Sequence, residues 1–357
     1  MLVGSIQGFV LCTLLAFHPQ YRRTSNLFLI LLIVTISVQN VSNSLIDIGF
    51  HWVEYVPLSW TLLIPFTLQF FVIYLIDPSH KLKKAEWLLL APFAFQLTFK
   101  VIFFALFQLD SEILKTQESS YRLLTHGMEV IAILWCLYVI LNSSRMIRKH
   151  ELNLKENFSE LKGRTLLWLD YTLKATAILW VLWAISFIYN IMVEPLNYLS
   201  YFNWIGMATI IYWIAYSVIV KRTVFEIPAA KGHETADSKS QLPSKADEYY
   251  QIIRHLMEEE KLFLTPELNM DMLSDKVGIS SGYISSILNK VEGKNFFDFI
   301  NNYRVAEVKA KIADPSFSHL SLLGMAYDSG FTSKSTFNAV FKKSTGMTPS
   351  AYKASRS

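Results

Sequence analysis

The stretch GMAYDSGFTSKSTFNAVFKKSTG, residues 324–346, has the residue order of two short helices joined by a tight turn. Gly330 can end the first helix, because glycine adopts positive φ without steric cost. Ser333 can cap the second helix through its hydroxyl. Phe337 and Phe341 then fall on one face at i, i+4 spacing, which predicts a buried side. The pattern is typical of a helix-turn-helix motif.

The same order of parts occurs earlier, in LSDKVGISSGYISSILNKVEG at residues 273–293, where Gly278 ends a helix and Ser280 caps the next one. Between the two copies, NFFDFINNYRVAEVKAKIAD at residues 295–314 reads as one helix. Its length is about 30 Å at 1.5 Å per residue. Successive major-groove faces on one side of DNA lie about 34 Å apart. One chain can therefore place two recognition helices in adjacent turns.

Charge supports DNA binding by its distribution and not by its total. The formal net charge of +4 over 357 residues is too small to indicate a nucleic-acid partner by itself. From Lys276 to the end of the chain, however, eleven Lys or Arg residues face five Asp or Glu residues, whereas residues 247–275 are acidic. A basic back part with an acidic front part is typical of a domain with one DNA-facing side.

Residues 249–353 resemble the DNA-binding domain of the AraC/XylS family. The segment GFTSKSTFNAVFKKSTGMTPSAY is similar to that family's signature, and the match includes the connecting helix. The resemblance implies binding of double-stranded DNA through both units. Carried over by position, it places base contacts on the first unit at Ser281, Gly282, Tyr283, Ser285 and Ser286, and on the second at Lys334, Ser335, Asn338 and Ala339.

The side chains of the first set are small. Because Ser can contact several bases and Gly contacts none, we expect the second helix-turn-helix motif to discriminate between DNA sequences. Phosphate contacts are predicted at Lys290, Lys342 and Lys343. The alternative for these lysines is that they complement the helix dipole. For Asn338, the alternative to a base contact is an ordinary surface position.

The N-terminal two thirds of the chain have a different composition. Overall, 52% of residues are hydrophobic and only 17% are charged, against about 25% charged in a typical soluble protein. A membrane span needs about 20 mostly apolar residues. Seven segments qualify, at about 2–18, 26–48, 55–76, 86–107, 123–143, 166–192 and 198–220.

Basic residues in the loops predict the orientation of these spans, because cytoplasmic loops carry an excess of Lys and Arg. One set of loops holds thirteen such residues and the opposite set holds two, Lys115 and Arg122. We therefore expect the N-terminus outside and everything after Arg222 in the cytoplasm. The thirteen are Arg22, Arg23, Lys81, Lys83, Lys84, Arg145, Arg148, Lys149, Lys155, Lys162, Arg164, Lys221 and Arg222.

Polar side chains inside the spans are costly and often functional. Asp47, Lys100, His126 and Glu129 are candidates for an outward-facing pocket for a ligand or ion. The alternative is interfacial snorkelling and hydrogen bonding between helices. No spacing motif supports a metal site, and we expect neither a metal nor another cofactor.

These observations predict an all-α chain with three parts. Residues 1–222 form a seven-span transmembrane sensor, 223–247 a flexible linker poor in apolar residues, and 248–357 a cytoplasmic domain with helix-turn-helix units at about 270–292 and 321–345. The whole chain resembles membrane-bound AraC-type regulators of bacteria. That resemblance implies a sensor in the bacterial inner membrane that acts directly on transcription. As a mechanism we expect a one-component sensor whose further partners are the lipid bilayer, an unknown small ligand or membrane signal, and a second copy in a homodimer, because the membrane raises the local concentration.

Two other classes of function compete with this interpretation. A membrane enzyme or transporter is disfavoured, because the sequence has no phosphate-binding loop, H-E-x-x-H or G-x-S-x-G motif and no repeated halves, so we expect no enzymatic activity. A receptor whose C-terminal domain signals by protein contact, without binding DNA, is the second alternative. The small side chains of the first recognition helix keep this alternative open.

Overall fold

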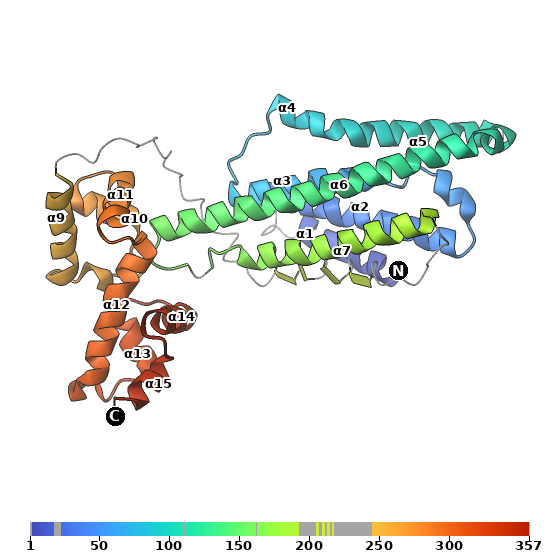
Figure 1. The fold of residues 1–357 in the computed structure, drawn as a ribbon. Helices are drawn as coiled ribbons and strands as arrows, with labels where there is room; N and C mark the ends of the chain where they lie inside the picture. Colours follow the sequence, from blue (N-terminus) through green and yellow to red (C-terminus); the bar gives the residue numbers. More distant parts are fainter. Residues whose placement is uncertain are drawn as a thin grey trace. The chain divides into compact units, whose positions relative to one another are not determined.

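The computed structural model describes residues 2–17, 23–109, 111–161, 163–192 and 245–356, together with 205–206, 209–210, 213–214 and 216–217. All regular elements in these ranges are helices, as expected for an all-α chain, and one isolated β-bridge pairs Phe158 with Asn269. The chain divides into two compact units (Figure 1). The predicted linker, residues 223–247, lies outside the described residues up to position 244.

The division does not follow the chain in a simple order. The first unit comprises Met1–Arg148 and Leu166–Glu226, and the second comprises Lys149–Thr165 and Ile227–Ser357. Residues 149–165, which the sequence pattern grouped with the spans, thus belong to the same unit as the helix-turn-helix motifs. This segment is called the docking segment below.

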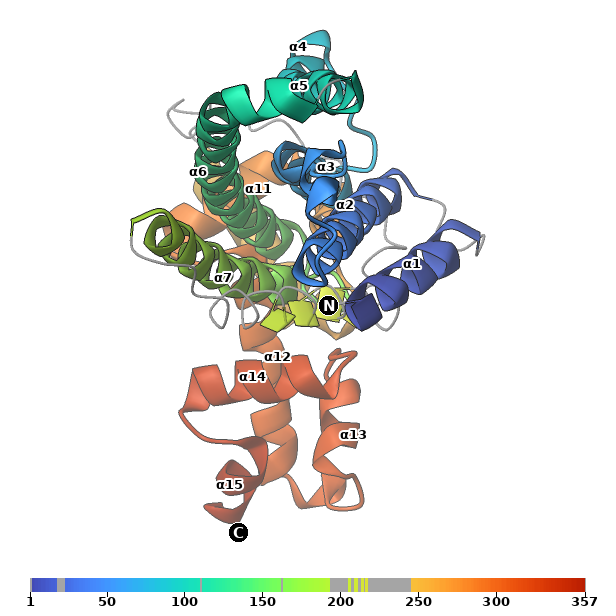
Figure 2. The same ribbon diagram turned by 90° about the vertical axis from the view of Figure 1, so that its right-hand side faces the viewer.

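The first unit is built from long apolar helices. Helix α2 lies between α1 and α3 (Figure 2), and an aromatic column of Phe28, Phe66, Phe70 and Tyr74 packs between α2 and α3. The helices are α1 (Leu2–Phe17), α2 (Thr24–Asp47), α3 (Ile64–Ile76), α4 (Lys84–Trp87), α5 (Ala91–Leu109), α6 (Ser111–Asn157) and α7 (Leu167–Met192).

Four helices of the described residues are long and apolar enough to cross a membrane, at Thr24–Asp47, Lys84–Leu106, Glu118–Asn157 and Leu167–Met192. A bundle of seven spans is therefore not confirmed. The first and third predicted spans appear as the shorter apolar helices Ser5–Phe17 and Thr61–Ile76. The third is shortened because residues 51–63 form short 3₁₀ helices around Pro57. The predicted seventh span, 198–220, lies mostly outside the described residues.

Helix α6 extends well beyond its predicted span of residues 123–143. It is 47 residues long, or about 70 Å at 1.5 Å per residue. Its last part, RKHELNLKEN, contains good helix formers and neither Gly nor Pro, so nothing in the sequence stops the helix where the apolar segment ends. Four of the basic residues that were expected in this loop, Arg145, Arg148, Lys149 and Lys155, therefore lie on a helix.

The second unit has two small cores that share one helix. Helix α12 runs from the group of α9, α10 and α11 to the group of α13, α14 and α15 (Figure 1). Phe299 and Ile300 of α12 lie in the first core, and Val305 and Val308 in the second. The helices are α9 (Ala246–Glu258), α10 (Met270–Val277), α11 (Ser281–Val291), α12 (Phe296–Ala313), α13 (Leu322–Tyr327), α14 (Lys334–Thr345) and α15 (Pro349–Ala354).

Candidate nucleic-acid interface

The first helix-turn-helix unit consists of α10, a tight turn and α11. Helix α10 ends at Gly278 with a φ of 78°, in the left-handed region where glycine is favoured. The hydroxyl of Ser274 donates to the Ile279 carbonyl at 2.5 Å and closes the turn. Ser280 then caps α11 by accepting from the Tyr283 amide. The turn residues identified in the sequence have the roles that were predicted for them.

The second helix-turn-helix motif repeats this plan in α13 and α14. Gly330 has a φ of 89°, and a Cβ at this position would lie 2.5 Å from the Phe263 carbonyl oxygen, so the turn requires glycine. Ser333 caps α14 through the Thr336 amide at 3.1 Å, and α14 ends at Gly346 with a φ of 76°. Phe337 and Phe341 are buried in the second core, as the spacing predicted.

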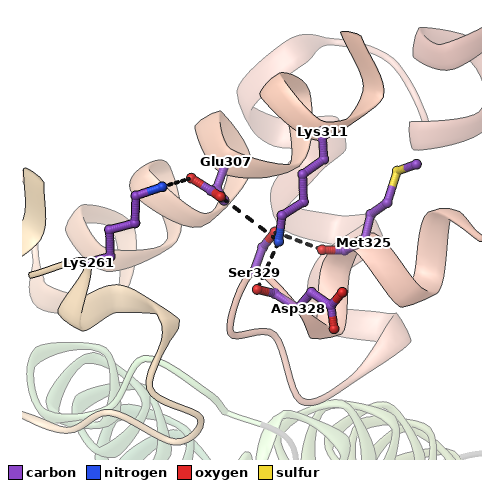
Figure 3. Close-up of polar contacts among 6 residues, drawn as sticks. All are labelled: Lys261, Glu307, Lys311, Met325, Asp328 and Ser329. Carbon is purple, nitrogen blue, oxygen red and sulfur yellow. Dashed lines mark hydrogen bonds and ion pairs between the residues drawn. The ribbon is translucent and has the colours of Figure 1, made fainter. Parts of the chain in front are cut away.

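A buried lysine holds the end of α13 against α12 (Figure 3). The Lys311 ammonium group donates to the Asp328 carbonyl at 2.9 Å and lies 3.2 Å from the Ser329 hydroxyl. Glu307 lies 4.0 Å from Lys311 and 3.3 Å from Lys261. A cation that meets the last carbonyl groups of a helix satisfies acceptors that have no partner inside the helix. The network thereby fixes the turn that leads into α14.

The residues of α14 that were predicted to contact bases all lie on its solvent-facing side. The exposed residues include Lys334, Ser335, Asn338 and Ala339, whose spacing of one and four positions places them on one face of the helix. Lysine and asparagine side chains can donate to base edges in the major groove. The opposite face carries the buried Phe337 and Phe341.

The predicted contacts on α11 are less accessible. Gly282 is exposed, whereas Tyr283, Ser285 and Ser286 are half-buried. Ser281 is buried and its hydroxyl donates to the Asp271 carboxylate at 3.1 Å. Of the candidate phosphate contacts, Lys290 and Lys342 are exposed, and the exposed Lys343 forms an ion pair with Asp298 at 2.8 Å.

The docking segment contacts both helix-turn-helix motifs. These contacts were not predicted from the sequence. Ser285 of α11 donates to the Glu156 carboxylate at 2.7 Å. Glu160, which is only 6% exposed, accepts hydrogen bonds from Thr332, Ser333 and Thr336 at the start of α14. These contacts join residues 129 to 176 positions apart, so no local pattern in the sequence reveals them.

Between these two points the docking segment meets the middle of α12. The carbonyl oxygen of Ser159 accepts from the Asn301 amide at 2.9 Å, and the guanidinium group of Arg304 lies 3.5 Å away. Arg304 is fully buried and also donates to the Phe263 and Thr265 carbonyls. Burial lowers the pKa of Arg304 to about 10, and the negative charge of Glu160 opposes this decrease. The guanidinium group therefore remains charged at neutral pH.

In the N-terminal compact unit, the structure brings together two of the four residues predicted for a ligand pocket, Lys100 and Glu129. Lys100 donates to Tyr121 at 2.7 Å and to the Glu54 carbonyl at 3.1 Å. Glu129 accepts from Thr61 at 3.5 Å, and Gln96 donates to the same hydroxyl. Two neighbouring hydrogen-bond networks thus hold one charged side chain each, and the two side chains attract each other electrostatically.

The other two pocket candidates are exposed, and the hydrogen bonds described for this cluster do not include them. Asp47 ends α2, and His126 lies edge-on against Phe187 at a ring distance of 5.5 Å. Within the described residues, no group of three or more His, Cys, Asp or Glu side chains is arranged to hold a metal ion.

Comparison with known proteins identifies the C-terminal part. Residues 273–355 match the family model described as a helix-turn-helix domain. A helix-turn-helix-type transcriptional regulator in the cgkA 5′ region of Pseudoalteromonas carrageenovora is 28% identical over 131 residues, covering 36% of this chain and 75% of that protein. The regulatory protein SoxS of Salmonella typhimurium is 26% identical over 105 residues, covering 29% of this chain and 95% of SoxS.

A solved structure of a protein of unknown function from Listeria innocua is also similar, with 26% identity and a TM-score of 0.27. It covers 30% of this chain and 96% of that one. Both named relatives are regulators, and neither name denotes an enzyme. The C-terminal part of the chain is a helix-turn-helix domain that is similar to parts of two transcriptional or regulatory proteins.

Proposed function

We propose that this protein is a membrane-tethered, one-component transcription regulator. Its second unit binds double-stranded DNA in a sequence-specific way on the cytoplasmic side. Its N-terminal residues, through up to seven spans, hold it in the bacterial inner membrane with the N-terminus outside. A signal from outside or from within the bilayer alters promoter binding, and no enzymatic step is required.

The exposed face of α14 carries the DNA-binding part of the proposal. Lys334, Ser335, Asn338 and Ala339 point to solvent from a helix whose opposite side is fixed in a core. A rigid helix with polar donors on its free face has the geometry that reads base edges in the major groove. Lys342 is exposed on the same helix one turn after Asn338, which supports its proposed contact with the phosphate backbone.

Membrane tethering is supported by composition and by charge. Four described helices are long and apolar enough to span a bilayer. The thirteen-to-two asymmetry of Lys and Arg between the two sides of the predicted spans favours a cytoplasmic C-terminus. Two copies that diffuse in one membrane would have a raised local concentration, which favours a homodimer on repeated DNA sites.

The buried cluster around Lys100 and Glu129 is our candidate for signal reception, with Asp47 and His126 nearer the solvent. Ionisable residues inside spanning helices are costly and are retained where they bind ligands or ions. Lys100→Met would remove the ammonium group with little change in volume. We expect it to alter the response to an inducing condition while leaving the affinity for DNA in nanodiscs unchanged.

Selection from a random DNA pool tests the function directly. Full-length protein in lipid nanodiscs would be incubated with a randomised duplex library, and bound sequences would be enriched and read. We expect one recurring motif with two half-sites about one helical turn apart. Recovery of unenriched sequences only, by protein that is shown to be folded, would contradict DNA recognition and favour signalling by protein contact.

Reporter fusions test the tethering. An alkaline phosphatase or a fluorescent protein fused after Arg222 distinguishes the two sides of the membrane, because each is active on one side only. We expect fluorescence and no phosphatase activity at this position. The reverse result, or a protein recovered entirely in the soluble fraction, would contradict the proposed topology.

A further inference from the structure

We propose that the docking segment, residues 149–165, is a built-in competitor of DNA: its two carboxylates, Glu156 and Glu160, hold the recognition helices in a closed state that must open before DNA binds. This inference rests on the proposed function, because it concerns the regulation of the same DNA-binding surface. It follows from four features of the second unit.

The first feature is the position of Glu160. Its carboxylate accepts from Thr332 at 2.9 Å, from Ser333 at 3.4 Å and from Thr336 at 2.5 Å. These hydroxyl groups surround the N-terminus of α14, where free amide groups and the helix dipole favour an anion. Helix N-termini and hydroxyl groups are also the groups that grip DNA phosphates. Glu160 therefore occupies the place that a phosphate group would take.

The second feature is that the same segment reaches the other recognition helix. Glu156 lies four residues before Glu160 and accepts from Ser285 of α11 at 2.7 Å. Ser285 is one of the residues predicted to contact bases. Two carboxylates from one short segment thus contact both recognition helices. Glu156 contacts a predicted base-contact residue, and Glu160 contacts residues next to the predicted base contacts of α14. A DNA duplex bound to both units would bring its negative charge against them.

The third feature is the depth at which the segment is held. Ser159 is fully buried, and its amide and hydroxyl groups both donate to the Leu268 carbonyl, at 3.2 Å and 2.5 Å. Its own carbonyl accepts from Asn301 at the middle of α12, where the helix passes from the first core to the second. The segment is therefore held by residues of the first core and of the shared helix α12, and not only by the two recognition helices.

The fourth feature connects the docking segment to the rest of the chain. Glu156 lies in the last turn of α6, a continuous helix from Ser111 to Asn157 whose residues 118–157 contain a candidate membrane span. A helix transmits a shift or rotation along its axis to its end. A displacement of α6 would therefore change the position of Glu156 and of the residues that follow it.

Three charge-removing variants of the full-length protein in nanodiscs test the inference. Glu160→Gln keeps the size and one acceptor of the side chain but removes its charge, and Glu156→Gln does the same at α11. Glu259→Gln is the matched control, because Glu259 is exposed at the end of α9 and carries the same charge. Affinity would be measured by fluorescence anisotropy on a duplex taken from the selection described above.

We expect Glu160→Gln to tighten binding about tenfold, because charge-assisted hydrogen bonds of the closed state are weakened. We expect Glu156→Gln to tighten it less and Glu259→Gln to leave it unchanged. Equal or weaker binding by both Glu160→Gln and Glu156→Gln would overturn the inference and make the segment a structural support. Absence of specific binding by the wild type and all variants would instead refute the proposed function, and this inference with it.

Hydrogen exchange on the unmodified protein gives an independent test that does not depend on the folding of a variant. In the closed state the Ser159 amide is buried and bonded. We expect saturating DNA to accelerate exchange in residues 158–161 while it protects α14. Slower or unchanged exchange in residues 158–161 with DNA bound would contradict competition.

Discussion

The two helix-turn-helix units have the same turn chemistry but different reading surfaces. Both recognition helices are capped by a serine, Ser280 or Ser333, and both follow a glycine in the left-handed region. At the positions predicted to contact bases, α14 exposes a lysine, two small residues and an asparagine. At the corresponding positions α11 exposes only a glycine, half-buries Ser285 and Ser286, and buries Ser281. The same turn geometry can therefore carry recognition helices with different surfaces. We propose that the second helix-turn-helix motif, with α14, provides most of the discrimination between DNA sequences.

Removal of a core side chain from one unit is expected to have the largest effect. Phe337→Ala should lower the free energy of unfolding by about 3–5 kcal/mol, because it leaves a cavity in the second core. Ile284→Ala occupies the matching position in the first core. If the two cores are energetically separate, hydrogen exchange will rise mainly in α13–α15 for Phe337→Ala and mainly in α10–α11 for Ile284→Ala. An equal rise in both units would show that they unfold together.

The next effect concerns base discrimination. Asn338→Ala should relax the preference at one base position by about 1–3 kcal/mol, which is the range for a bidentate contact. Ser286→Ala in α11 should change specificity much less. Both variants would be profiled on a library of single-base substitutions of the selected site. A larger loss for Ser286→Ala would reverse the roles that we assign to the two units.

The lysines near the ends of the recognition helices should act on all sequences alike. If they contact phosphates, the double variant Lys342→Ala, Lys343→Ala should reduce the slope of log affinity against log salt by about 2, and Lys290→Ala by about 1. The ion pair of Lys343 with Asp298 is exposed, so its exchange for a phosphate contact costs little. An unchanged slope would return these residues to a role at the helix dipole.

The smallest predicted effect distinguishes how the two recognition helices end. Glu292 follows α11, and hydrogen bonds from Lys294 and then Tyr250 hold the pKa of its carboxyl below the usual value. Since the folded-state pKa is the lower one, the contribution is present above about pH 4.5 and is lost as the pH falls further. Glu292→Gln should cost at most about 0.5 kcal/mol at pH 7, and nothing below the folded-state pKa.

Thermal unfolding of Glu292→Gln at a series of pH values would check this expectation. Both recognition helices are followed by a glycine in the left-handed region, Gly293 or Gly346, but α14 has Thr345 where α11 has the Glu292 carboxylate. A destabilisation by Glu292→Gln that persists unchanged at pH 3 would show that the carboxylate acts by packing and not by charge.

The sequence predicted those parts of the fold that depend on neighbouring residues. Residues 295–314 were expected to form one helix, and α12 runs from Phe296 to Ala313 with Asn295 as its cap. The serine caps and the glycine stops were likewise found in place. Each of these features depends on side chains within four positions of each other, where spacing carries the information.

Features that depend on contacts across the chain were not predicted. The docking of Glu160 joins residues more than 170 positions apart, and the hydroxyl of Ser281 donates to Asp271 in another helix. The polar tail of α6 is a helix and not the predicted loop, because it contains good helix formers and neither Gly nor Pro. The predicted site on α14 is exposed as DNA contact requires, whereas α11 is partly covered by residues that no spacing rule connects to it.

Helix α12 has a consequence for how this protein can evolve. Phe299 and Ile300 of this helix lie in the first core, and Val305 and Val308 lie in the second. The helix has 18 residues, or about 27 Å, and it fixes how the two recognition helices are oriented about its axis. One inserted residue would rotate one surface by about 100° away from the other. Only insertions or deletions of a whole turn, three or four residues at a time, would change the spacing of the half-sites and keep both recognition helices on one side of the DNA. The length of α12 therefore restricts which half-site spacings can evolve.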